Sequence, residues 1–409
     1  MKKSGNFFEI KTNKEFNDFA LKTFIFQYSN NLIYKKYCDL IGSNLDSVSC
    51  VNDIPYLPII FFKKNKIKSF KGKSKLFFNS SGTTSKNLST HHLNKIENYK
   101  ESFSRCFKSF YGPLKNLTIL ALLPSYLKQK NSSLIFMMNE LINDTKKKES
   151  GFYLYDYEKL SKTIDFLEKN KRKTILIGIV PSLLSFGKLF PKKLTHTIIM
   201  ETGGMKNLPV ELTRKEIHQK LKGFFGVNSI HSEYGMTELL SQGYSYKNGV
   251  FKNPPWMKMF TYELNNPFKI NTIGKVGRLN IIDLANQDSC SFISTDDIGR
   301  SFNDCSYEVL GRLDNAWHRH ELVRQDCPRP PSEYVERFSV DSAVFDDKTL
   351  QFLLDVMGDA RVMMGSDYPF PLGEIHPGEM IKNSELIDDE TKQAVLYDNA
   401  ANFFGITND

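Results

Sequence analysis

Apolar residues fall into two kinds of spacing that alternate along the chain. Short, nearly continuous apolar runs predict buried strands at 117–123, 174–180, 196–200 and 279–284. Apolar residues at helical spacing predict amphipathic helices at 157–167 and 212–224. Because strands that alternate with helices usually form parallel sheets, the pattern predicts an α/β fold with mixed, largely parallel sheets.

The two ends of the chain carry further periodic patterns. Residues 13–41 are predicted to form one amphipathic helix, which Thr12 and Glu15 begin with the spacing of a capping box. Near the other end, the pattern predicts a helix, a strand and a second helix at 348–357, 361–364 and 389–403. The end of the chain thus repeats the α/β pattern on a smaller scale.

The charge of the chain changes sign near residue 315. Residues 316–409 contain 8 Lys and Arg against 18 Asp and Glu, whereas residues 1–315 contain 47 against 28, which gives net charges of −10 and +19. Lysine outnumbers arginine 41 to 6 in the first part, but 3 Lys accompany 5 Arg in the second. With 409 residues available, we expect two domains of different origin, 1–314 and 315–409.

The lysines of the first part do not favour a nucleic-acid partner. Clustered Lys and Arg neutralise phosphates, but these lysines are spread through every segment, as on a solvated surface. No apolar run approaches the roughly 18 residues of a membrane span, and the first residues lack the apolar core of a signal peptide. The six cysteines are widely spaced. We therefore expect a cytoplasmic protein with reduced thiols and neither a nucleic-acid partner nor a membrane span.

Four short segments carry candidate chemistry. Residues 77–86, FFNSSGTTSK, place hydroxyls and a glycine directly after an apolar run. Such a loop binds phosphates through backbone N–H groups and hydroxyls, although a plain Ser/Thr turn has the same composition. Downstream follow SEYGMTE at 232–238, STDDIGR at 294–300 and LGRLD at 310–314.

In this order, the four segments resemble the phosphate loop, the Tyr-Gly-x-Thr-Glu segment, the Thr-Gly-Asp segment and the Gly-Arg-x-Asp hinge of the adenylate-forming superfamily. Three longer segments of the sequence, at 120–127, 200–206 and 231–242, are similar to the acyl-protein synthetase (LuxE-like) branch of this superfamily. The resemblance runs from about residue 7 to 315. It implies the adenylate-forming large-domain fold and an enzyme that binds ATP and Mg²⁺.

The resemblance also implies the phosphate and metal ligands. The loop residues that would hold the β- and γ-phosphates are Ser80, Ser81, Gly82, Thr83 and Thr84. Thr237 would contact the α-phosphate, and Glu238 would bind Mg²⁺, a cation that prefers carboxylate oxygen. These two residues are the expected catalytic pair.

The nucleoside would be held by a second group of residues. By the resemblance, Tyr234 would stack beside the adenine with Gly235 next to it, and Asp297 would accept hydrogen bonds from the ribose hydroxyls, reinforced by Arg312. A structural alternative remains for each residue alone, with Asp297 and Arg312 as a surface ion pair and Tyr234 as a core residue.

The implied reaction is the activation of a fatty acid or other small carboxylate. The carboxylate oxygen attacks the α-phosphorus of ATP, pyrophosphate leaves, and the acyl group passes from the adenylate to a thiol, either a protein cysteine or coenzyme A. Alignment and preorganised positive charge are sufficient for the first step.

This sequence departs from the family pattern in two places. Ser85 and Leu88 stand where the family loop commonly has glycine and lysine, so we expect weaker phosphate binding. The short cysteine-bearing end of the family is also replaced. Cys290 and Cys305 lie in or beside segments with the apolar pattern of a strand, and we expect both to be core residues rather than acyl carriers.

The end of the chain resembles a second family. VMMGSDYPFPLG at 362–373, with AWH at 316–318 and FSVDS at 338–342, is similar to the last strands of aminocarboxymuconate-semialdehyde decarboxylase, an amidohydrolase-superfamily barrel. The match spans about 311–405 and implies a partial (β/α) barrel in which Asp367 occupies a metal-ligand position.

Two alternatives to the acyl-activating function remain. A metal-dependent decarboxylase would need histidine ligands from earlier barrel strands, which residues 1–310 do not supply. The sequence His318-Arg319-His320 resembles a late loop of the barrel rather than its first strand. We therefore expect this activity to be absent and the metal position at Asp367 to be empty. The other alternative is a gene-fusion product with damaged catalysis.

Overall fold

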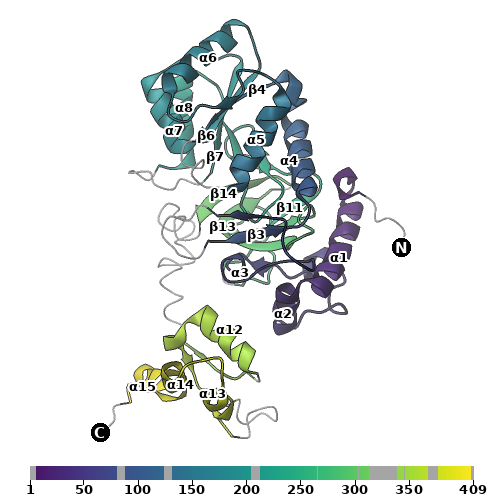
Figure 1. Cartoon of the computed structure of the whole chain (residues 1–409), viewed down its shortest axis with the longest axis vertical. Coiled ribbons are helices and arrows are strands. Elements are labelled where there is room, and N and C mark those ends of the chain that lie inside the picture. The colour runs from purple at the N-terminus through teal and green to yellow at the C-terminus, as the bar shows by residue number, and fades with distance from the viewer. Residues whose placement is uncertain are drawn as a thin grey trace. The chain divides into compact units, whose positions relative to one another are not determined.

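The computed structural model describes residues 6–80, 88–123, 131–203, 212–264, 266–302, 304–312, 339–344, 346–366 and 376–406. The chain divides into two compact units, residues 1–323 and 324–409 (Figure 1). The predicted boundary between residues 314 and 315 lies outside the described residues, so it stays a prediction.

The first unit begins with two helices where one was predicted. α1 spans Asn13–Asn30, and Thr12 and Glu15 form the predicted capping box. α2 spans Leu32–Leu40, so the prediction of one helix over 13–41 is wrong. Asn31 separates them because its side chain accepts from the Tyr34 N–H (3.1 Å) and donates to the carbonyl oxygen of Ser289 (3.1 Å).

A mixed sheet of twelve strands organises the first unit, in the order β11-β12-β13-β14-β10-β9-β8-β7-β6-β4-β5 with β1 beside β13. The parallel part contains β4 (Thr118–Leu122), β5 (Gly151–Phe152), β6 (Thr174–Ile179), β7 (Thr197–Thr202) and β8 (His231–Tyr234). The antiparallel part contains β9 (Gly243–Ser245), β10 (Val250–Lys252), β11 (Met257–Tyr262), β12 (Gly277–Asp283), β13 (Phe292–Ser301) and β14 (Tyr307–Arg312). β1 (Leu57–Pro58) pairs with β13 in parallel. The predicted α/β class with a mixed sheet is confirmed.

Helices cover both faces of the parallel strands (Figure 1). α7 (Val180–Leu189) and α8 (Arg214–Phe225) lie on one side, and α4 (Ile96–Tyr111) and α5 (Ser133–Thr145) lie on the other. α6 (Tyr157–Lys169) contributes Leu160, Ile164 and Leu167 to the core that it shares with α7 and α8. Strands buried on both faces explain the continuous apolar runs that predicted β4 and β6.

A short hairpin carries the first of the four motif segments. β2 (Leu76–Asn79) pairs antiparallel with β3 (Thr90–Leu93), and α3 (Phe61–Lys64) packs against β3. The segment predicted to bind phosphate therefore connects two paired strands. This hairpin fixes both ends of the loop.

The second unit has a small core of its own. β15 (Val340–Asp341) and β16 (Val362–Met363) pair in parallel. The helices are α12 (Asp347–Met357), α13 (Glu379–Asn383), α14 (Asp389–Gln393), a π-helical turn at Ala394–Asp398 and α15 (Asn399–Phe404). Leu350, Leu354, Val362, Ile381 and Val395 form the buried cluster. The predicted helices and strand are confirmed within a few residues.

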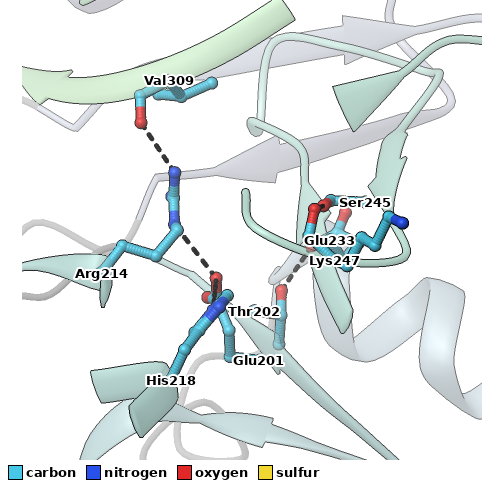
Figure 2. Close-up of polar contacts among 8 residues, drawn as sticks. All are labelled: Glu201, Thr202, Arg214, His218, Glu233, Ser245, Lys247 and Val309. Carbon is cyan, nitrogen blue, oxygen red and sulfur yellow. Dashed lines mark hydrogen bonds and ion pairs between the residues drawn. The ribbon is translucent and has the colours of Figure 1, made fainter. Parts of the chain in front are cut away.

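Two buried glutamates, Glu201 of β7 and Glu233 of β8, lie on adjacent strands and face opposite sides of the sheet. Thr202 pairs with Glu233 across the strands and donates a hydrogen bond to its carboxylate (Figure 2). Burial raises the pKa of Glu233 to about 7, the bond from Thr202 opposes this, and the neighbouring Glu201 adds to it. The folded state therefore favours protonated Glu233 near neutral pH.

This raised pKa predicts a pH-dependent stability. An unfolded glutamate has a pKa of about 4.3, so the stability from Glu233 is complete below that value and is lost as the pH rises to about 7. At about 1.4 kcal/mol per unit of pKa difference, the loss is roughly 4 kcal/mol. Glu233→Gln removes this titration, so the variant should gain stability relative to the natural protein between pH 5 and 8, as measured by urea unfolding. Exposed Glu97→Gln is the control, and parallel profiles for the Glu233 variant and the natural protein would contradict the prediction.

Candidate functional site

The turn after β8 presents the carboxylate of Glu238 from a buried position. The Glu238 residue is 4% exposed. Burial raises the pKa of this carboxyl, while a hydrogen bond with Ser89 and the charges of Lys63 and Arg312 lower it. A buried carboxylate is a ligand for a cation, and the two cationic side chains near it attract an anion such as a phosphate.

A second buried carboxylate holds this turn in place. Asp283, at the end of β12, accepts hydrogen bonds from the backbone N–H groups of Leu240 (2.8 Å) and Ser241 (2.9 Å) and from the Ser241 hydroxyl (2.7 Å). Burial raises the pKa of Asp283, and these hydrogen bonds oppose the rise. The turn is thus fixed by a group from a distant strand.

His91 and Asn286 hold the same turn through its backbone carbonyl oxygens. The Asn286 amide donates to the Glu238 carbonyl oxygen (2.8 Å), and the two ring nitrogens of His91 lie 2.8 Å from the Thr237 carbonyl oxygen and 2.9 Å from Asn286 Oδ1. Burial lowers the pKa of His91 to about 4. The neutral ring carries one N–H at physiological pH, so it donates to one of these two acceptors at a time.

The base of the hydroxyl-rich loop reaches Glu238 through Ser89. The Ser80 N–H donates to the Ser89 carbonyl oxygen (3.0 Å), and the Ser89 N–H donates to the Ser80 hydroxyl (3.1 Å). Ser89 in turn hydrogen-bonds Glu238. The other predicted phosphate ligands, Ser81, Gly82, Thr83 and Thr84, lie outside the described residues.

The predicted ribose ligands lie opposite each other on neighbouring strands. Asp297 of β13 and Arg312 of β14 are register partners, and the Tyr234 hydroxyl donates to Asp297 Oδ2 (2.7 Å). Burial raises the pKa of Asp297, whereas Tyr234 and Arg312 lower it. Arg312 is exposed, so its guanidinium is accessible to a ligand.

Tyr234 also packs in the core beside this pair. Its ring lies edge-on to Phe251 (6.0 Å between centroids) and Tyr307 (6.2 Å), and Gly235 next to it is exposed. Tyr234 therefore packs as a core residue, which was the alternative to a ligand-binding role. Its hydroxyl also orients the Asp297 carboxylate. Stacking on adenine stays a prediction.

The described site residues therefore converge. Glu238 acts electrostatically on Tyr234, and Arg312 acts on both Glu238 and Asp297. The sequence analysis missed the residues that support this arrangement, namely Ser89, His91, Asp283 and Asn286. No local signal identified them, because each acts on a residue that is distant in sequence.

The oxygen donors at this site fit Mg²⁺. Glu238 supplies a buried carboxylate, and the Ser80 hydroxyl lies on the segment that Ser89 joins to Glu238; oxygen donors of this kind suit the ion. Nowhere in the part of the chain that the structure describes, this site included, do three His, Cys, Asp or Glu side chains form a metal-binding group. Asp367, the predicted remnant ligand, lies outside that part.

The two cysteines named as core residues differ. Cys290 is buried, as predicted, whereas Cys305 is exposed in the turn between β13 and β14, with φ of +59°. The prediction is wrong for Cys305 because a tight strand connection, rather than a strand, holds it. None of the helices in the described residues combines the length and apolarity needed to cross a membrane.

Solved adenylate-forming ligases share the fold. A 2-hydroxyisobutyryl-CoA ligase in the postadenylation state, in complex with R3-HIB-AMP, superposes with a TM-score of 0.55 at 8% identity and covers 74% of this chain and 68% of its own. The same ligase in an open conformation with 2-HIB-AMP and CoA gives 0.54, covering 74% and 70%. At this identity, the likeness establishes the fold.

The end of the chain has a separate relationship. The amidohydrolase family matches residues 307–406. The 2-amino-3-carboxymuconate-6-semialdehyde decarboxylases of Dictyostelium discoideum and Caenorhabditis elegans are 40% and 29% identical over 99 and 100 residues, 24% of this chain. These matches span only 28% and 25% of the two relatives. The chain thus ends in an amidohydrolase segment about a quarter of the length of these enzymes.

The larger part of the chain has one family assignment. The model of the LuxE acyl-protein synthetases matches residues 6–320, which include the converging site and the whole mixed sheet. The protein belongs to the acyl-protein synthetase (LuxE) family and carries a C-terminal amidohydrolase segment.

Proposed function

We propose that residues 1–314 activate a fatty acid with ATP as an acyl adenylate and transfer the acyl group to a thiol in the cytoplasm. The observation that carries this proposal is the convergence of Glu238, Asp297, Tyr234 and Arg312 with the base of the hydroxyl-rich loop. Family membership supports the same reaction class. The structurally similar 2-hydroxyisobutyryl-CoA ligase, in complex with 2-HIB-AMP and with R3-HIB-AMP, supports adenylate formation.

The first step forms one bond and breaks one. A carboxylate oxygen of the fatty acid attacks the α-phosphorus of ATP, the bond from that phosphorus to the bridging oxygen breaks, and pyrophosphate leaves with the electron pair. Thr237 would orient the α-phosphate, and the hydroxyl-rich loop would hold the β- and γ-phosphates. These groups lower the barrier by aligning two anions that repel each other.

Glu238 would hold the Mg²⁺ ion at the phosphates. When bound, the ion neutralises phosphate charge and orients the leaving group. Asp283, His91 and Asn286 keep Glu238 in position through the backbone of the turn. Since burial of Glu238 otherwise raises its pKa, a bound cation would favour the ionised form.

Asp297 would bind the ribose hydroxyls. Its bond from Tyr234 orients the carboxylate, and Arg312 across the strand pair would supply N–H donors to the same sugar. Tyr234 and Gly235 would lie against the adenine. The ribose pair fixes the nucleoside while the phosphates react.

The second step transfers the acyl group to sulfur. A thiolate attacks the acyl carbonyl carbon, the bond to the phosphate oxygen breaks, and AMP leaves. Membership of the acyl-protein synthetase family favours a protein as the acceptor, and we propose that a cysteine of that protein supplies the thiol. The structurally similar 2-hydroxyisobutyryl-CoA ligase in complex with CoA makes coenzyme A the other candidate. Cys290 is buried, so it is not accessible as the acceptor. We do not propose decarboxylation, because the chain covers about a quarter of each decarboxylase.

Replacing Glu238 tests the metal role. Glu238→Gln keeps the size of the side chain and removes the charge, so we expect fatty-acid-dependent ATP–pyrophosphate exchange to fall by about 100-fold. Exposed Glu158→Gln on α6 is the matched control and should keep full exchange. Exchange by Glu238→Gln at the rate of the control, with unchanged thermal unfolding in both, would reject the assignment.

Replacing Asp297 tests the ribose role. Asp297→Asn weakens a charge-assisted contact with a diol, so the KM for ATP in the exchange assay should rise about 10-fold or more. Asp296→Asn, at the exposed neighbouring position, is the control for a local change in charge. The proposal fails at this residue if both variants raise the KM for ATP equally.

A further inference from the structure

Arg214 connects the parallel part of the sheet to the strand that carries Arg312. It is the first residue of α8, which Thr213 and Glu216 begin with a capping box. Its guanidinium donates to the Val309 carbonyl oxygen of β14 (2.7 Å), and its Nε lies 3.2 Å from Glu201 Oε1 of β7 (Figure 2). One side chain thus joins three elements that are far apart in the sequence.

The Glu201 end of this connection is buried. Glu201 is 3% exposed, and its Oε1 lies 3.6 Å from His218 Nε2 as well as near Arg214. Burial raises the pKa of Glu201, but contacts with His218 and Arg214 outweigh it, so the pKa lies below its usual value. Arg214 itself is partly exposed, and its loss would leave the buried Glu201 carboxylate without its arginine partner, which is costly.

The other end of the connection lies where the strand ladder is irregular. β10 pairs with Glu308 and Tyr307 of β14, so the ladder with β10 stops one residue before Val309. The register between β13 and β14 shifts at Ile298–Gly299, between the pair that includes Val309 and the pair that joins Asp297 to Arg312. Arg214 therefore fixes β14 next to a bulge, just before Arg312.

The aromatic core provides a second connection from Arg214 to Asp297. The guanidinium lies 5.3 Å from the centroid of Phe251. The Phe251 ring packs against Tyr234 at 6.0 Å, and Tyr234 donates to Asp297. Arg214 also lowers the pKa of Asp297 through its charge.

We infer that Arg214 is a positioning residue for nucleotide binding, which holds Asp297 and Arg312 in the arrangement that the ribose requires by tying β14 to Glu201 of β7. The inference rests on the proposed function, because it concerns the nucleotide of that site. It assigns Arg214 an effect on ATP affinity and none on the fatty acid.

The test compares two substitutions of Arg214 with a matched control. Arg214→Met removes the charge and both contacts, and Arg214→Lys keeps the charge but cannot make the forked contact to two acceptors. Arg105→Met is the control, because Arg105 also makes an ion pair (2.8 Å to Glu101) and lies over an aromatic ring (5.4 Å to Phe8). Each full-length variant is titrated with ATP and Mg²⁺ by calorimetry and assayed for exchange, and its unfolding temperature is measured.

We expect Arg214→Met to weaken ATP binding about 10-fold and to raise the KM for ATP similarly, with the KM for the fatty acid unchanged. Arg214→Lys should show a smaller effect in the same direction, and Arg105→Met none. The inference is overturned if both Arg214 variants bind ATP like the natural protein, even with a lower unfolding temperature, or if both KM values rise together. If the natural protein itself binds no ATP, the proposed function fails first and the inference fails with it.

Discussion

The hydrogen bond from Tyr234 to Asp297 joins the two parts of the sheet at the place where the proposed chemistry occurs. Tyr234 ends β8, the last strand of the parallel part, and Asp297 lies on β13 of the antiparallel part. Glu238 lies in the turn that follows Tyr234, so the same bond ties the segment of Glu238, the proposed metal ligand, to Asp297, the proposed ribose ligand. The remaining polar contacts keep this geometry: Asp283 and Asn286 hold the turn, and Arg214 holds the far strand.

Local patterns in the sequence predicted the elements that depend on local forces. The buried strands β4 and β6 and the capping box at Thr12 follow from apolar runs and from hydrogen bonds within four residues. The break at Asn31 was not predictable, because its cause is a contact with Ser289 far along the chain. Helical spacing continues on both sides of that break. His91 and Asn286 were not predictable either, because their contacts with each other and with Thr237 join residues far apart in the sequence.

The family pattern identified the site residues, and the structure shows the contacts that bring them together. Ser80, Glu238 and Asp297 belong to separate segments, yet Ser89 links the first to the second and Tyr234 links the turn to the third. The amidohydrolase segment forms its own small core and contributes none of these residues. The chain thus combines a unit that carries a candidate active site with a C-terminal segment that matches the amidohydrolase family, and the two parts of the sequence differ in the sign of their net charge.

The most direct test is a crystal structure of the full chain with a non-hydrolysable acyl adenylate analogue. We expect the ribose hydroxyls to lie within hydrogen-bond distance of the Asp297 carboxylate and the phosphate analogue to lie beside Thr237. A nucleotide bound at another surface, or a bound analogue whose ribose makes no contact with Asp297, would contradict it.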